Sequence, residues 1–172
     1  MRKSYYLFTL LWVGALFASC KKDSIAYKNS FEKSYQSWLN FKKSSGNSYQ
    51  YTVSTGSWTG ASTQTIITVK EGKIVQRSCV RRIIDPETNK SVVIAEWSED
   101  ESNLNTHSYG AATITLDDIY QKARTEWLTK KEHAKIYFES GNDGMISSCG
   151  YVDNNCVDDC FRGITIDHIE AI

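Results

Sequence analysis

The densest group of oxygen-bearing side chains in the sequence lies near the C-terminus, in residues 153–159. Carboxylates, amides and loop carbonyls are the hard ligands that Ca²⁺ takes, about six to eight at a time. The EF-hand spacing and its closing glutamate are absent, and a solvated acidic turn before a strand is the favoured explanation of the same residues. Calcium is therefore a candidate ligand rather than a required cofactor. The candidate ligands are Asp153, Asn155, Asp158 and Asp159.

Nucleophilic catalysis would need a serine or cysteine beside a histidine that an acid orients. The three histidines, His107, His133 and His168, are spread along the chain, and the sequence has no Gly-x-Ser-x-Gly elbow. Neighbouring acids such as Asp117 and Asp118 fit the start of a helix, whose dipole favours negative charge. We assign no catalytic residue. An extracytoplasmic hydrolase built on these histidines is an alternative to a binding protein.

The cysteines indicate disulfide chemistry. Cys20 belongs to the leader described below, and the even number that remains suggests two disulfides in an oxidising compartment. Three pairings are open; we favour Cys156 with Cys160 across a tight loop, and Cys79 with Cys149 between strands. A zinc site would also suit the spacing of Cys156 and Cys160, but no histidine or second close cysteine pair supports it.

The N-terminus has the pattern of an export signal. Arg2 and Lys3 precede an apolar run over residues 5–17, shorter than the roughly 20 residues that a membrane-spanning helix needs. The run ends in Phe-Ala-Ser-Cys, which resembles a lipobox with phenylalanine where leucine is commonest. The resemblance implies cleavage before Cys20 and acylation of that cysteine. A plain secreted protein, in which Cys20 is incidental, is the alternative.

The same leader divides the chain into three parts. We expect a signal peptide over residues 1–19, a lipidated cysteine with its tether over 20–29, and a single domain over 30–172. Two or more acyl chains give stable membrane anchoring. The charged residues after Cys20 resemble a surface-export signal of some Gram-negative envelopes. The sequence thus predicts an outer-membrane lipoprotein and leaves open whether it faces the periplasm or the surface.

Composition limits the partners. The 20 basic residues balance 20 acidic ones, so there is no basic surplus for a phosphate backbone, and nucleic acid is not an expected partner. A hydrophobic content of 41% indicates a folded core. Among the aromatic residues, Trp127 has the helical spacing of a core residue. Trp58, in a Gly/Ser/Thr loop, is the least typical of a core and is our candidate for ligand binding.

Hydrophobic periodicity predicts two helices. The first spans about residues 23–45, and Gly46 can take the left-handed conformation that ends it. The second begins at Thr115, which forms a capping-box pattern with Asp118, and ends near residue 130. Four residues form the apolar stripe of the first helix: Phe31, Tyr35, Trp38 and Leu39.

Alternation and turn residues predict seven strands. Glu71-Gly72 forms a two-residue hairpin turn, because glycine tolerates positive φ. Strands follow strands through short turns, so we predict an α+β fold: a mainly antiparallel sheet of about six to seven strands, with two helices packed on one face. The strands are expected at residues 49–53, 63–69, 73–80, 91–97, 135–139, 145–152 and 161–169.

This order of elements resembles a family of small bacterial envelope lipoproteins catalogued only as a domain of unknown function. Three patterns carry the resemblance: a tyrosine strand at 49–51 after a helix containing Trp38, a V-x-x-G-x-V hairpin at 67–75, and the segments 115–120 and 157–159 before the last strand. The family's usual Gly-Tyr-Pro turn is replaced by residues 141–144. The family has no assigned activity, so the resemblance implies a fold and a location without a reaction.

Together, these features predict a membrane-anchored lipoprotein whose domain is a non-catalytic binding or interaction module of the cell envelope. Its expected partners are the membrane, through the lipid anchor, and an envelope protein or glycan. The alternatives are the extracytoplasmic hydrolase and a calcium-stabilised binding domain.

Overall fold

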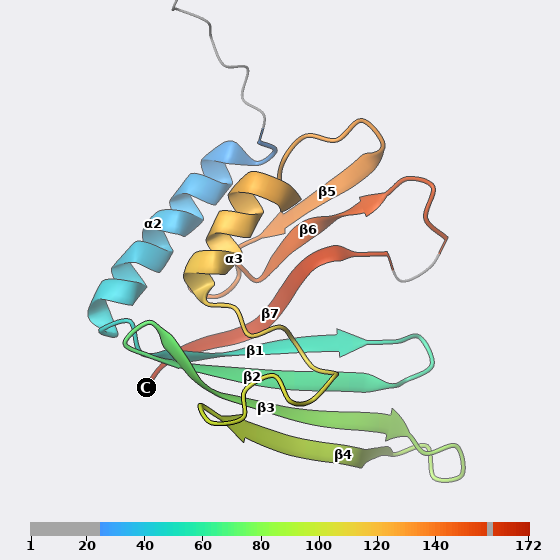
Figure 1. Cartoon of the computed structure of the whole chain (residues 1–172). Helices are drawn as coiled ribbons and strands as arrows, with labels where there is room; N and C mark the ends of the chain where they lie inside the picture. The colour runs from blue at the N-terminus through green and yellow to red at the C-terminus, as the bar shows by residue number, and fades with distance from the viewer. Residues whose placement is uncertain (1–24, 158–159) are drawn as a thin grey trace, which may run out of the picture.

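The computed structural model describes residues 25–157 and 160–172. In this part of the chain, seven strands form one antiparallel sheet, and the helices pack on one of its faces (Figure 1). The predicted α+β class is confirmed. No helix among these residues has both the length and the apolar character to cross a membrane. The leader and Cys20 lie outside the described residues.

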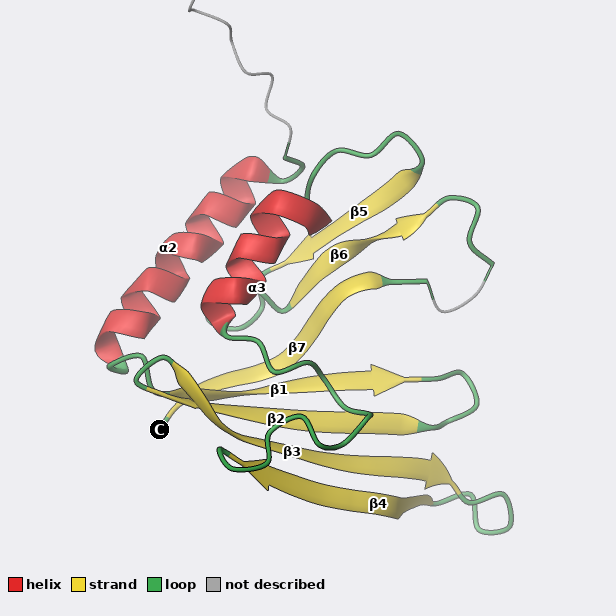
Figure 2. Cartoon of the chain, in the orientation of Figure 1, coloured by secondary structure: helices red, strands yellow, loops and turns green. Residues whose placement is uncertain are grey.

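The elements follow one another in the order expected from the sequence (Figure 2). A helix precedes four strands, and a second helical segment precedes three more. They are α2 (Lys28–Ser44), β1 (Tyr49–Gly56), β2 (Ser62–Lys70), β3 (Lys73–Ile84), β4 (Ser91–Asp100), α3 (Leu116–Lys122), η2 (Ala123–Trp127), β5 (Ala134–Glu139), β6 (Ser148–Asp153) and β7 (Arg162–Ala171).

The last strand lies in the middle of the sheet. The strand order is β4-β3-β2-β1-β7-β6-β5, so β7 joins the β1–β4 meander to the β5–β6 hairpin. β1 pairs with β7 only from Tyr49 opposite Ala171 to Val53 opposite Ile166. Beyond this point, β1 continues to pair with β2, and β7 with β6. We call this separation, between residues 54–56 of β1 and 162–165 of β7, the fork.

The core lies between the helices and the central strands of the sheet, β2, β1, β7 and β6. Trp38 of α2 is fully buried and donates its indole N–H to Asp117 Oδ1 of α3 at 3.0 Å. The Tyr49 hydroxyl accepts a hydrogen bond from the Leu116 amide at 2.9 Å. These bonds satisfy polar groups that burial would otherwise destabilise, and they fix the second helical segment over the first strand.

Local signals in the sequence produced the turns and caps expected of them. Glu71 and Gly72 both have positive φ, as a type I′ hairpin turn requires. Thr115 and Asp118 form a reciprocal capping box at the start of α3. The second helix ends earlier than residue 130, however, because its last turn widens into a π-helix at Ala123–Trp127. Ile25, which falls within the segment predicted to be the tether, forms a β-bridge with Thr129.

The structure contains the predicted Cys156–Cys160 disulfide. The prediction that Cys79 pairs with Cys149 is wrong: both are free and buried. Cys79 lies on β3 and Cys149 on β6, with three strands between them. Adjacent strands are about 4.8 Å apart, and a disulfide needs Cα atoms within about 7 Å of each other. Burial raises the pKa of the Cys149 thiol to about 12, so this thiol stays protonated and unreactive.

Candidate functional site

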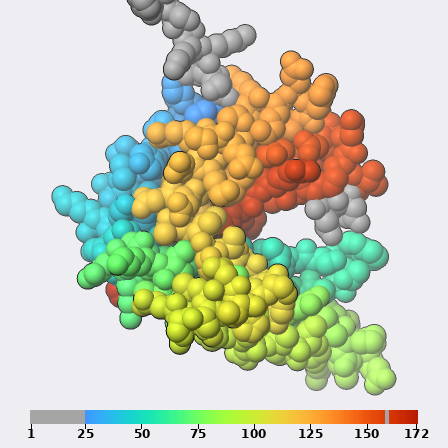
Figure 3. Space-filling model, viewed as in Figure 1, coloured from blue at the N-terminus to red at the C-terminus, as the bar shows by residue number. Residues whose placement is uncertain are grey.

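A cleft of about 690 Å³ opens at the fork of the sheet. Figure 3 shows the molecule hollowed between the β1–β2 hairpin and β7. The second helical segment and the loop before it form the remaining wall. The volume falls in the ~300–1,000 Å³ range of small-molecule sites. The separation of two central strands therefore creates a ligand-sized space in the middle of the sheet.

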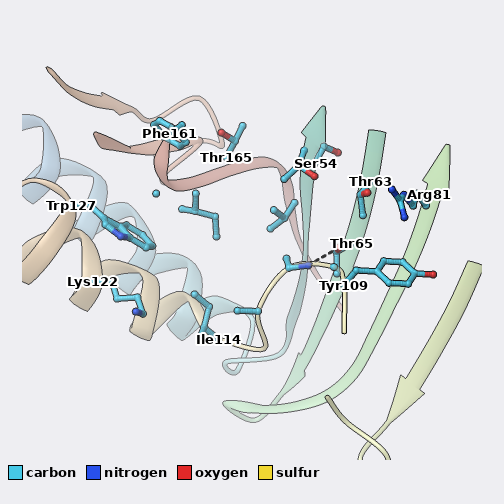
Figure 4. A pocket seen from close by; sticks show the side chains of 17 residues that line it. Ser54, Thr63, Thr65, Arg81, Tyr109, Ile114, Lys122, Trp127, Phe161 and Thr165 are labelled. Atoms are coloured by element: carbon cyan, nitrogen blue, oxygen red, sulfur yellow. Dashed lines mark hydrogen bonds between the residues drawn. The ribbon is translucent and has the colours of Figure 1, made fainter. Parts of the chain in front are cut away.

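One end of the cleft is apolar. Trp127 from η2 and Ile164 from β7 line it, although only 7% and 9% of their surfaces are exposed. Phe161 lies on the same side of the cleft as Trp127 (Figure 4). Val53 of β1 is a further apolar residue of the cleft lining. A ligand at this end would bury apolar surface at a contribution of roughly 25 cal/mol per Å².

The other end of the cleft is polar. Ser54, Thr63 and Thr65 present hydroxyls from β1 and β2, and Arg81 extends from β3. In Figure 4, Arg81 and Tyr109 lie across the cleft from Trp127. A few convergent polar groups beside an apolar wall are typical of sites that fix the orientation of a ligand.

The loop that connects β4 to α3 forms one wall of the cleft, and two contacts hold it in place. The Ala111 amide donates a hydrogen bond to Thr65 Oγ1 at 2.9 Å, which attaches the loop to β2. Gly110 has φ +103° and lies against the Trp97 ring, where an added Cβ would stand 3.1 Å away. Both the backbone conformation and the space thus favour glycine at this point.

A buried ion pair holds the preceding part of the same loop. Arg77 on β3 makes two parallel hydrogen bonds to Glu99 on β4, of 2.8 and 2.9 Å. Glu99 also accepts the backbone amides of Asn105 and His107, at 2.8 and 2.7 Å. The His107 ring stacks on Trp97 with centroids 4.3 Å apart. This cluster ties residues 105–107 to the sheet.

The Glu99 carboxylate is committed to this structural role. The Arg77 guanidinium, and then the His107 and Asn105 amides, hold the pKa of Glu99 well below its usual range despite its burial. Both carboxylate oxygens already accept several hydrogen bonds. A carboxylate held ionised in this way does not exchange a proton near neutral pH.

The cations at the cleft differ in their surroundings. Lys122, on the α3 wall, has Glu126 at 3.9 Å. Arg81 lies 5.9 Å from the Tyr109 ring centroid. Within the described residues, no carboxylate lies within 4.0 Å of the Arg81 guanidinium, and none lines the cleft. The polar end therefore carries a positive charge that no acid of residues 25–157 or 160–172 balances.

The histidines considered for catalysis are not brought together. His107 is engaged with Glu99, with Nδ1 at 3.0 Å from Oε1. His133 is exposed just before β5. His168 is exposed on β7, 3.6 Å from Glu170. None of the three lines the cleft.

Asp153, Asn155 and Trp58, the described members of the candidate calcium and ligand-binding residues, do not line the cleft. Asp153 is 3.6 Å from Arg162, Asn155 is exposed, and Asp158 and Asp159 lie outside the described residues. Elsewhere in the described chain, no group of three or more His, Cys, Asp or Glu side chains is arranged to hold a metal ion. Trp58 is 83% exposed in the turn between β1 and β2.

The sequence does not single out Arg81 and Tyr109, which line the polar end of the cleft. Arg81 follows the predicted strand 73–80, although the alternation of the buried Arg77 and Cys79 continues through it. Tyr109 lies in none of the predicted helices and strands. Their proximity depends on which strands neighbour each other, which no local pattern encodes.

The fold and the cleft together define an α+β domain with a ligand-sized cavity at a break between two central strands. No protein-family model matches the chain, and neither a curated protein nor a solved structure matches it.

Proposed function

We propose that this protein is a bacterial envelope lipoprotein, anchored through an acylated Cys20, whose domain binds a small ligand in the cleft without catalysing a reaction. The observation that supports binding is the cleft itself, with its apolar wall and its few convergent polar groups. The anchor rests on the basic, apolar and small-residue pattern that ends at Cys20.

The anchor is tested by replacing the cysteine that would carry it. We expect Cys20→Ser to abolish incorporation of radiolabelled palmitate and to move the protein from the membrane fraction, because the acyl chains would supply the membrane affinity. Ser19→Ala is the matched control, since it keeps a small residue before the cysteine and should keep the label. Equal membrane retention of Cys20→Ser and the wild type would contradict the lipid anchor.

The binding site is tested by filling the cleft. Thr165 lines it from an exposed position on β7, so Thr165→Phe should occupy the space without entering the core. We expect small molecules that co-purify with the wild-type protein from envelope extracts, measured by mass spectrometry, to be lost from this variant.

Thr52→Phe is the matched control for the cleft-filling variant. Thr52 is a β1 threonine opposite His168 and does not line the cleft. Its co-purified molecules should match those of the wild type. If the wild type and Thr165→Phe retained the same compounds, the cleft would not be the binding site.

A further inference from the structure

The two ends of the cleft differ in a way that restricts the ligand. Trp127 and Ile164, both largely buried, form an apolar wall at one end. Arg81 forms the other end, with Thr63 beside it on β2 (Figure 4). Thr55 of β1, directly opposite Thr63, lines the same end. A wholly apolar ligand would leave the polar end unmatched, and a wholly polar one would leave the apolar wall in water. An amphipathic ligand satisfies both ends.

The charge at the polar end specifies the head group. Arg81 is the cleft cation with no carboxylate within 4.0 Å among the described residues, whereas Lys122 has Glu126 beside it. Arginine presents a planar fork of N–H donors that matches a carboxylate in a bidentate arrangement. One unbalanced cation is suited to one negative charge.

We propose that the cleft binds an amphipathic monocarboxylate, with its carboxylate on Arg81 and its apolar body directed towards Trp127 and Ile164. This inference rests on the proposed binding function and names the class of ligand. The Thr63 and Thr55 hydroxyls, in the same cross-strand row as Arg81, supply additional donors to the carboxylate oxygens.

The inference is tested by competition with a fluorescent fatty acid. Dansylaminoundecanoate is titrated into the purified mature domain, and binding is followed by energy transfer from tryptophan to the dansyl group. Decanoate and decyltrimethylammonium, which share an alkyl chain and differ in charge, then compete for the site. We expect decanoate to compete at least about tenfold more strongly, because its carboxylate makes charge-assisted hydrogen bonds to Arg81 that the ammonium group cannot make.

Two neighbouring arginines supply the matched pair of variants. Arg81→Gln should weaken decanoate binding roughly tenfold or more. Arg82→Gln removes the same charge from the next residue of β3, which does not line the cleft. It should change affinity by less than about twofold, because a charge outside the cleft makes no hydrogen bond to the ligand and acts only through screened solvent. Thr165→Phe should abolish probe binding.

Several results would overturn the inference. If decanoate and decyltrimethylammonium competed equally, and Arg81→Gln did not change the affinity for decanoate, the cleft would select apolar chains regardless of charge. Displacement of the probe by a blocked valine–threonine pentapeptide but not by decanoate would indicate strand addition at the fork instead. Absence of binding, or binding unaffected by Thr165→Phe, would also refute it. The proposed binding function fails only if Thr165→Phe retains the co-purified compounds of the wild type.

Discussion

Replacing Arg77 with methionine is expected to lower the thermal midpoint of unfolding by about 10 °C or more. The substitution leaves the Glu99 carboxylate buried without the two hydrogen bonds that compensate its charge. Removal of one partner from a buried ion pair is strongly destabilising, because the remaining charge stays desolvated without its counter-charge. The Asn105 and His107 amides still donate to Glu99, but they carry no full positive charge. Differential scanning calorimetry of the mature domain measures the change directly.

Arg124→Met is the control for loss of an arginine. Arg124 lies 3.4 Å from Glu32, but both side chains are about half exposed, and exposed ion pairs contribute little. Its midpoint should stay close to that of the wild type. If the two variants melted at the same temperature, the Arg77–Glu99 pair would not be an important source of stability.

The same pair gives stability a defined pH dependence. Arg77 lowers the pKa of Glu99 in the folded protein, so the folded state binds fewer protons than the unfolded state. The stabilisation is therefore fully present above the unfolded glutamate pKa of about 4.3 and is lost progressively as the pH falls below it. Arg77→Met should flatten the fall in midpoint between neutral and acidic pH.

Short-range patterns were sufficient to predict the elements of this fold. The Glu71-Gly72 turn and the Thr115–Asp118 capping box each depend on residues within four positions of one another. Their geometry follows from local φ preferences and from hydrogen bonds that a short segment can complete alone. Helix and strand order therefore follow from the sequence, although boundaries shifted where a strand lengthened or a helix ended in a π-turn.

Long-range neighbours could not be predicted in the same way. The insertion of β7 between β1 and β6 determines that Cys79 and Cys149 are far apart. It also creates the fork, where β1 and β7 stop pairing after Val53 and Ile166. Each strand has the ordinary alternating pattern of a β-strand. Which strands become neighbours in the sheet depends instead on the packing of the whole core. The cleft is therefore a property of topology rather than of any motif.

Gly163→Ala should be among the most damaging single substitutions in the sheet. Gly163 lies directly opposite Gly150 in the β6–β7 pair. A Cβ at residue 163 would lie 2.5 Å from the Gly150 Cα and 2.9 Å from the Cys149 carbonyl carbon. Overpacking commonly destabilises by about 1–3 kcal/mol, and here the obstacle is backbone that cannot rotate away. We expect a loss of about 3 kcal/mol or more in the free energy of unfolding by urea.

Gly56→Ala tests whether the effect is specific to this contact. Gly56 ends β1 beside the fork, and a Cβ there would meet nothing within 4 Å. Its stability should change by no more than about 1 kcal/mol, since alanine also restricts the unfolded chain. The two glycines at positions 150 and 163 let β6 and β7 lie closer together than a side chain at either position would allow, on the strand that borders the cleft. If Gly163→Ala were as stable as the wild type, this backbone contact would not restrict the residue at position 163.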